Sequence, residues 1–169
     1  MKIRESNSED IDNIYNLQIE CFSKSDIWYR AIIQQYLDTG YVIENNNNKL
    51  IGVLLHGDIN ACDRGEEFIP LNDEGKDFLN NNLQNEKFNG IVMICIHPEY
   101  QNQGLATLLV KKYFDMNKQS KYCLFTRKNN TKAIKLYNKM GYSQIGFIPN
   151  KYFFPNEDAL FFMKNYLES

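Results

Sequence analysis

The fold of this chain is constrained most by a short apolar run that ends at a proline and leads into a helix. Residues 91–96 are apolar and mostly β-branched, which is typical of a strand buried within a sheet. Pro98 cannot continue such a strand, and a helical repeat begins soon after it. Five side chains follow that repeat: Leu105, Leu108, Leu109, Tyr113 and Met116. We predict a buried strand, a break, and a helix that opens at about Gly104.

The rest of the chain alternates between strand and helix patterns. Ser8 is the predicted cap of a first helix. Four side chains share the apolar face of that helix: Ile11, Ile14, Tyr15 and Phe22. A second helix is predicted over residues 26–37, closing at Gly40, and another over 131–140, ended by Gly141. Strands are predicted at residues 2–4, 41–44, 50–56, 122–126, 143–148 and 159–164. This order predicts an α/β domain, in which helices cover both faces of a mixed sheet.

The segment 57–89 interrupts this alternation. It is polar, rich in Asn, Asp and Glu, and has no clear period apart from a short predicted helix at 74–83. No linker or repeat suggests a second domain. We therefore expect residues 1–169 to form a single domain with 57–89 as a polar insertion between strands.

Composition limits the possible partners. The net charge of −2 gives no overall attraction to nucleic acid or to an acidic membrane surface. The first ten residues are too polar for a secretory signal, and the apolar runs are too short to cross a bilayer. The cysteines are scattered, which argues against a disulfide framework or a metal site and for reduced thiols in a cytoplasmic protein. They are Cys21, Cys62, Cys95 and Cys123.

The predicted start of the helix near Gly104 has the features of an anion site. The first amides of a helix have no partner within it and lie at the positive end of its dipole. Gly104 and Ala106 add little bulk, so a pyrophosphate can approach the backbone closely. A plain helix start with small residues is the alternative, and the position after an apolar strand favours the anion site.

Two motifs in the second half resemble those of the GNAT superfamily of N-acetyltransferases. Residues 101–106, Q-N-Q-G-L-A, resemble the family signature Q/R-x-x-G-x-G/A. Residues 130–142 are similar to the family's N-x-x-A-x-x-L-Y-x-x-x-G-F/Y helix. The resemblance implies a mixed, mostly antiparallel sheet of about six to seven strands and acetyl-coenzyme A as donor, without a metal.

The same resemblance implies roles for individual residues. Backbone groups of the strand segment Ile94, Cys95 and Ile96 are expected to hold the pantetheine arm. The pyrophosphate is expected to bind at Gln101, Asn102, Gln103, Gly104, Leu105, Ala106 and Thr107. Asn130 is expected to contact the pantetheine arm, and Tyr137 to protonate the thiolate of coenzyme A. A phenol is protonated at neutral pH and can therefore act as this acid, although a tyrosine on a helix can also simply pack.

The general base is not evident from the sequence. Some relatives have Glu or His on the strand before the Asn helix, where this chain has Phe125. Glu66, Glu67 and His97 are the other candidates, yet acidic residues in a polar segment are commonly solvated and His97 can merely anchor a turn. A covalent route through Cys95 or Cys123 has no histidine at triad spacing to support it.

A finer resemblance bears on the acceptor. Residues 126–137 and 151–164 are similar to the ribosomal-protein and N-terminal protein acetyltransferase branch, which implies Phe22, Tyr29, Tyr152 and Phe153 as walls of an acceptor groove. The most favoured acceptor is a protein or peptide N-terminal α-amine. A small amine (polyamine, amino acid or amino sugar) and a non-catalytic coenzyme A-binding module are the alternatives. The chain is expected to be a monomer or homodimer.

Overall fold

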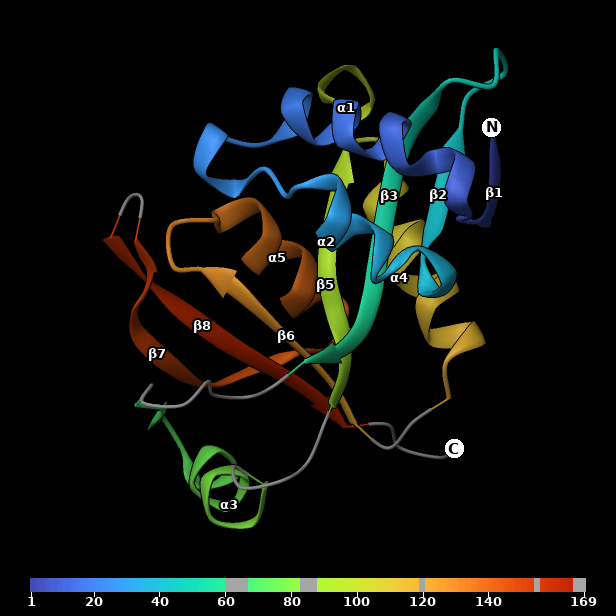
Figure 1. Cartoon of the computed structure of the whole chain (residues 1–169). Helices are drawn as coiled ribbons and strands as arrows, with labels where there is room; N and C mark the ends of the chain where they lie inside the picture. The colour runs from blue at the N-terminus through green and yellow to red at the C-terminus, as the bar shows by residue number, and fades with distance from the viewer. Residues whose placement is uncertain (60–66, 83–87, 119–120, 154–155, 166–169) are drawn as a thin grey trace. The chain divides into compact units, whose positions relative to one another are not determined.

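The structure, a computed structural model, describes residues 1–59, 67–82, 88–118, 121–153 and 156–165. Its strands are β1 (Lys2–Glu5), β2 (Tyr41–Glu44), β3 (Leu50–Ile59), β4 (Ile69–Pro70), β5 (Phe88–Ile96), β6 (Lys121–Arg127), β7 (Ser143–Phe153) and β8 (Asn156–Asn165). Its α-helices are α1 (Ile11–Cys21), α2 (Arg30–Gln34), α3 (Asp73–Asn82), α4 (Leu105–Met116) and α5 (Thr131–Lys139) (Figure 1).

The strands form a sheet in the order β1-β2-β3-β5-β6-β8-β7-β4. The pairing of β5 with β6 is parallel, whereas β1 with β2, β2 with β3, β6 with β8, β7 with β8 and β4 with β7 are antiparallel. The predicted fold class, a mixed and mostly antiparallel sheet flanked by helices, is confirmed. Over the described residues the sheet has eight strands rather than six or seven, because β4 was not predicted.

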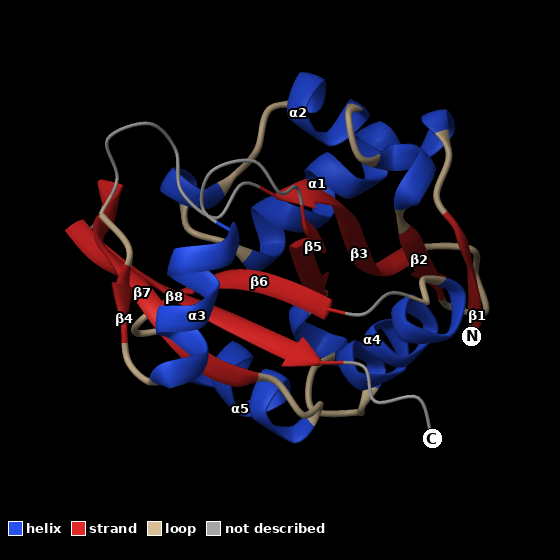
Figure 2. Ribbon diagram, turned by 90° about the horizontal axis from the view of Figure 1, so that it is seen from below, coloured by secondary structure: helices blue, strands red, loops and turns tan. Residues whose placement is uncertain are grey.

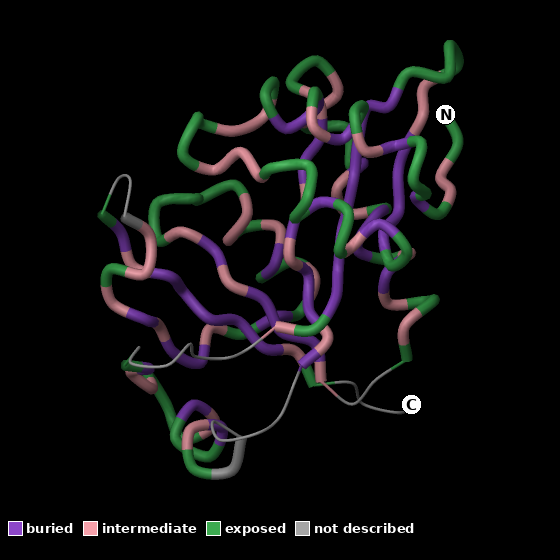
Figure 3. The backbone as a smooth tube through the Cα atoms, viewed as in Figure 1, coloured by how far each residue is buried: buried purple, intermediate pink, exposed green. Residues whose placement is uncertain are grey.

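The chain divides into two compact units, and β5 runs through both. The first comprises residues 1–57 and 92–118. There α1 and α2 pack on one face of β2, β3 and β5, through a core that includes Ile14, Ile33, Val42 and Val53. The ring of Tyr113 on α4 lies 4.7 Å from that of His56, on the opposite face of β3 because side chains alternate along a strand. Figure 3 shows how continuously β3 is buried.

The second unit comprises residues 58–91 and 119–169. Its β6, β8 and β7 carry α5 on one face and α3 on the other (Figure 2). Phe162 on β8 faces Tyr137 of α5, at 6.2 Å between ring centroids. The neighbouring Phe161 faces Phe78 of α3, at 4.9 Å. The alternation of side chains along β8 therefore gives each helix its own face of the sheet.

The described part of the insertion contains more regular structure than its composition indicated. The helix predicted at 74–83 is present as α3, but 57–89 also contains the end of β3, the start of β5, and β4. Phe68, Phe78 and Phe88 are buried in one aromatic cluster with Phe161. Scattered aromatic residues in a polar segment thus supply the apolar face that a periodicity search missed.

Two predicted helix boundaries were wrong. Residues 26–37 do not form one helix, because only α2 is α-helical and 3-10 turns flank it at Lys24–Asp26 and Leu37–Thr39. Gly40 has an extended backbone, and a Cβ there would lie 2.3 Å from Ser6 Oγ, so packing explains this glycine. The first helical segment is capped by Asn7 rather than Ser8, in a capping box with Asp10.

The other predicted elements occur near their expected positions. Strands β7 and β8 are longer than predicted, since they continue toward each other across their hairpin. The helix expected from about Gly104 begins at Leu105. Among the helices of the described residues, none is long and apolar enough to cross a membrane.

Candidate functional site

The turn between β5 and α4 is held in place from three sides within the first unit. The backbone N–H of His97 donates to the carbonyl of Ile51 on β3 at 2.8 Å. The Asn45 side-chain amide donates to the hydroxyl of Tyr100 at 3.2 Å, and the Gln101 amide donates back to the Ile96 carbonyl at 3.0 Å. The first residue of the Q-N-Q-G-L-A motif therefore ties the turn to the end of the strand.

Gly104 begins α4 in a left-handed conformation, with φ of +80°. The first i to i−4 helical bond runs from Leu108 N–H to Gly104 C=O at 3.0 Å, so the amides of Leu105, Ala106 and Thr107 precede the hydrogen-bonded ladder. A Cβ built on Gly104 would meet no atom within 4 Å. Open space at a helix N-terminus, beside amides that have no helical acceptor, fits a phosphate group.

The predicted flanking residues of this turn differ in their orientation. Asn102 is exposed, with φ of +61°, and the Gln103 side-chain amide donates to the Glu99 carbonyl at 3.2 Å. Leu105 is buried, at 6% exposure, and packs rather than facing a ligand with its side chain. Most of these residues can therefore contact a pyrophosphate only through their backbone amides.

The backbone of β5 offers an edge at Ile94 and Ile96. Because His97 points its N–H at β3 and successive residues of a strand alternate, Ile94 and Ile96 direct their N–H and C=O groups away from β3. The parallel pairing between β5 and β6 covers Gly90 with Cys123 and Ile91 with Leu124. Ile94 and Ile96, the residues predicted to hold the pantetheine arm, thus lie beyond the paired part of β5. The Ile96 carbonyl already accepts a hydrogen bond from the Gln101 side chain.

Cys95 lies in the first unit's core rather than in an accessible position. It is 5% exposed and packs with the residues of α1 and α2. The neighbouring thiol of Cys21, together with burial, raises the pKa of Cys95, which disfavours the thiolate that a nucleophile requires. Burial likewise raises the pKa of Cys123 to about 12. Cys62 lies outside the described residues.

The second unit contains the predicted Asn130 and Tyr137. Asn130 caps α5, with its side-chain oxygen accepting from the Ala133 N–H at 3.2 Å. Tyr137 is 4% exposed and packs against Tyr142 and Phe162. Burial, and after it the nearby phenol of Tyr152, raises the pKa of Tyr137 above its usual value of 10.0. Within the part of the chain that the structure describes, its hydroxyl has no hydrogen-bond partner, so it remains able to donate to a ligand.

The described candidates for the general base have other contacts. Phe125 packs on Phe161 at 4.7 Å between ring centroids and belongs to the aromatic cluster under α3. The His97 ring accepts a hydrogen bond from the Glu99 N–H at 3.4 Å and lies 3.4 Å from Lys49 Nζ. These contacts fit a residue that anchors the turn. Glu67 is exposed, and Glu66 lies outside the described residues.

The predicted acceptor walls are spread over both units. In the first, Phe22 is half-buried against the core and Tyr29 is 77% exposed. In the second, Tyr152 lies on β7 with the guanidinium of Arg127 over its ring, 4.2 Å from the centroid. Phe153 is the last residue of β7. Sequence reasoning assigned no role to Arg127 or to its ion-pair partner Glu157, although both lie in segments that resembled the family.

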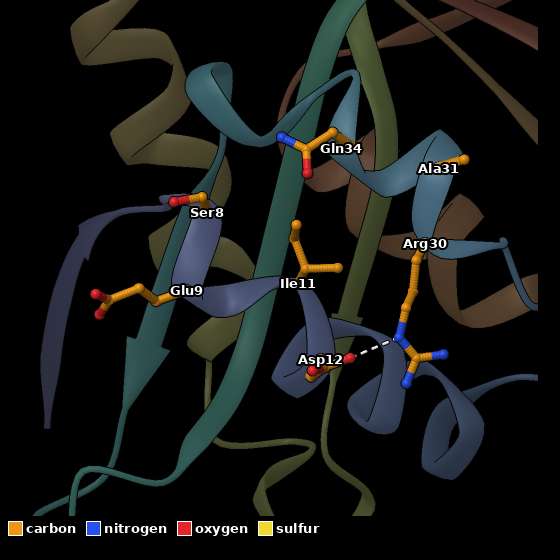
Figure 4. A pocket seen from close by; sticks show the side chains of 7 residues that line it. All are labelled: Ser8, Glu9, Ile11, Asp12, Arg30, Ala31 and Gln34. Carbon is orange, nitrogen blue, oxygen red and sulfur yellow. Dashed lines mark hydrogen bonds and ion pairs between the residues drawn. The ribbon is translucent and has the colours of Figure 1, made fainter.

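A pocket of about 460 Å³ lies at the surface of the first unit (Figure 4). It is lined by Ser8, Glu9, Ile11, Asp12, Arg30, Ala31 and Gln34. The Arg30 guanidinium turns toward Asp12 and pairs with it at 2.5 Å, as Figure 4 shows. No predicted catalytic or cofactor-binding residue lines this pocket.

The fold is similar to those of several solved structures. The fold is similar to that of a ribosomal-protein-S18-alanine N-acetyltransferase from Escherichia coli, with a TM-score of 0.72 and 17% identity over 99% of this chain and 95% of that one. Naa20 from Chaetomium thermophilum, in complex with a bisubstrate analogue, gives 0.74 and 17% over 98% and 86%. NAA60 from Arabidopsis thaliana, in complex with acetyl-CoA, gives 0.74 and 14% over 98% and 99%.

A comparison with curated proteins found no match. The model of the Acetyltransferase (GNAT) family matches residues 11–142, which is most of the chain and includes the turn at Gly104 and the helix of Tyr137. This chain therefore belongs to the GNAT acetyltransferase family.

Proposed function

We propose that the protein transfers acetyl from acetyl-coenzyme A to the α-amine of a protein or peptide N-terminus by direct attack, without an acyl-enzyme. The observation that carries the proposal is the open space at Gly104, at a helix start whose first amides have no helical acceptor. An acceptor of this class is supported by the likeness to a ribosomal-protein-S18-alanine N-acetyltransferase.

The donor side uses backbone groups. The amides of Leu105, Ala106 and Thr107, at the positive end of α4, would hold the pyrophosphate. The outward edge of β5 at Ile94 and Ile96 would pair with the amides of the pantetheine arm. Gln101 supports both, because its bond to the Ile96 carbonyl fixes the turn relative to the strand.

The acid is Tyr137. When the amine nitrogen attacks the thioester carbonyl, the carbon–sulfur bond breaks and the sulfur leaves as a thiolate. The buried phenol of Tyr137 has a raised pKa and is therefore protonated throughout the physiological range. Proton donation from it to the sulfur makes the leaving group neutral.

The aromatic residue at Phe125, in place of a base, supports an α-amine as the acceptor. An α-amine with a pKa near 8 is neutral in about a tenth of molecules at pH 7, whereas a lysine amine near 10.4 is neutral in fewer than about one in a thousand. Without a carboxylate or imidazole on β6, the α-amine is the acceptor that attacks with the least help. Water then takes the proton that the amine loses, and the phenolate left on Tyr137 regains a proton from solvent.

The test is thiol release from acetyl-coenzyme A with a panel of acceptors. The panel contains short peptides with free α-amines, the same peptides with a blocked N-terminus and one lysine, spermidine and glucosamine. Turnover with the free α-amines and not with the blocked peptides is expected. Turnover with spermidine or glucosamine alone would identify a small amine, rather than a peptide N-terminus, as the acceptor. Coenzyme A binding without release of thiol from any mixture would indicate a non-catalytic binding module.

A further inference from the structure

Two segments that are distant in the sequence meet at the end of β6 in the second unit. Arg127 is the last residue of β6 and is paired with Ala159 of β8 in the strand register. Its Nη1 lies 3.6 Å from Oε2 of Glu157, and the two side chains are only 16% and 6% exposed. The other carboxylate oxygen, Oε1, accepts the backbone N–H of Asn129. One buried carboxylate therefore contacts both the strand end and the turn that leads into α5.

The Arg127 side chain has a second partner on another strand. Its guanidinium carbon lies 4.2 Å from the ring centroid of Tyr152 on β7, and Tyr152 is paired with Glu157 across the β7–β8 hairpin. A planar cation over a ring face fixes the plane of the ring as well as attracting it. The orientation of Tyr152 thus depends on a cation whose own position depends on Glu157.

The same carboxylate also acts on the helix that carries Tyr137. Glu157 holds the Asn129 N–H, and the next residue, Asn130, donates its N–H to the Arg127 carbonyl at 3.0 Å and caps α5. Removal of the Arg127–Glu157 pair would therefore loosen the turn that begins the helix of the proposed acid.

A neighbouring ion pair provides a contrast. Lys128 Nζ lies 3.1 Å from Asp158 Oδ2, but the lysine side chain is 61% exposed. An exposed pair contributes little, whereas loss of one partner from a buried pair leaves a charge without compensation. Lys128 directly follows Arg127 at the end of β6, and Asp158 directly follows Glu157 on β8, so the two pairs form a matched set for mutation.

We propose that Arg127 and Glu157 are positioning residues for the acceptor side of the reaction, acting through the ring of Tyr152. The proposal rests on the proposed function, since it assigns Tyr152 to the site where the amine enters. Neither residue donates or accepts a proton in the transfer. Their role is to hold the ring in one orientation while the α5 turn stays fixed.

The sharpest test compares single variants with a double variant. Arg127→Met removes the cation and leaves the buried charge of Glu157 without an ion-pair partner, so both stability and acceptor binding should fall. Arg127→Met with Glu157→Gln removes that charge and keeps an oxygen for the Asn129 N–H, so stability should recover. Because the ring of Tyr152 still lacks its cation, the acceptor KM should stay at least about tenfold raised, with the acetyl-coenzyme A KM within about twofold of wild type.

Control and conservative variants complete the design. Lys128→Met should leave both KM values within about twofold of wild type. Arg127→Lys keeps the charge without the planar stack, and should raise the acceptor KM with a smaller loss of thermal stability than Arg127→Met. It also provides a folded variant if Arg127→Met does not fold.

Two results would overturn the inference. One is an acceptor KM that returns to the wild-type value in the double variant together with stability, and the other is an equal rise in both KM values. Failure of the proposed function is distinct from either, because it would appear as absence of thiol release by the wild-type protein with every free α-amine.

Discussion

Replacement of Gly104 by alanine tests the anion site with the smallest possible change. Gly104 has φ of +80°, and the added methyl group would enter space that contains no protein atom within 4 Å. The cost to folding is therefore the left-handed backbone alone, about 1 kcal/mol after the lower entropy of the unfolded alanine chain is included. We expect a fall in melting temperature of about 2–4 °C.

The cost to binding should be larger. If the pyrophosphate contacts the amides at the start of α4, a methyl group in that space forces it away from at least one of them. Loss of one hydrogen bond to a charged group costs about 1.5–3 kcal/mol. The dissociation constant for coenzyme A should therefore rise roughly ten- to a hundredfold.

Gly141 is the matched control. It also has a positive φ, +83°, and a Cβ there would meet the flexible end of Lys164 at 2.7 Å. Gly141→Ala should cost a similar amount of stability without changing coenzyme A affinity. Calorimetric titration measures the dissociation constant, and thermal unfolding measures stability. Wild-type affinity in folded Gly104→Ala, or equal loss of affinity in both variants, would refute the anion site.

Three further variants test other parts of the structure. Tyr137→Phe should lower kcat at least about tenfold with little change in coenzyme A affinity, and unchanged turnover in the thiol-release assay would remove Tyr137 from its role as acid. Phe78→Ala should lower the free energy of unfolding by about 3–5 kcal/mol in a denaturant titration, whereas Leu71→Ala, at 54% exposure, should change it by less than about 0.5 kcal/mol; equal effects would contradict the buried packing of the insertion. At Asp10, burial alone would raise the pKa, but two 2.7 Å bonds from Arg4 and the Asn7 N–H outweigh it and lower the pKa. The stabilisation by the ionised carboxylate is complete above about pH 4 and is lost as the pH falls toward the native pKa. Asp10→Asn should therefore lower the free energy of unfolding by about 1–3 kcal/mol at pH 7 and by less in acid. A loss that does not change with pH would show that the charge of Asp10 is not the source of the stabilisation.

The elements that the sequence predicted well are those defined by local signals. Pro98 and Gly104 mark the turn between β5 and α4, because a proline stops a strand and a left-handed residue begins the helix. Asn130 and Gly141 bound α5 in the same way, through a side-chain cap and a positive φ. These features depend on a few neighbouring residues and are therefore visible in the chain itself.

The features that were missed depend on residues far apart in the sequence. Gly40 looked like a helix stop, yet it is small because Ser6 and Leu55 approach it from other elements. Arg127 and Glu157 are separated by a helix and a strand, and only the sheet register brings them together. A polar insertion hid Phe78 for the same reason, since its partner Phe161 lies on β8, far along the chain.

The absence of a base at Phe125 and the presence of the insertion have a common physical basis. Phe125 lies against Phe161, and Phe161 in turn contacts Phe68 and Phe78, both supplied by the insertion. A carboxylate or imidazole at position 125 would then face an aromatic cluster, where desolvation disfavours a charged side chain. A carboxylate is charged before it takes a proton, and an imidazole is charged afterwards, so both would be disfavoured there. An aromatic residue is the side chain that this covered face of the sheet accommodates. The aromatic residue at position 125 and the packing of the insertion are therefore coupled in the second unit. If the acceptor is an α-amine, as we propose, its own neutral fraction then determines how readily it attacks.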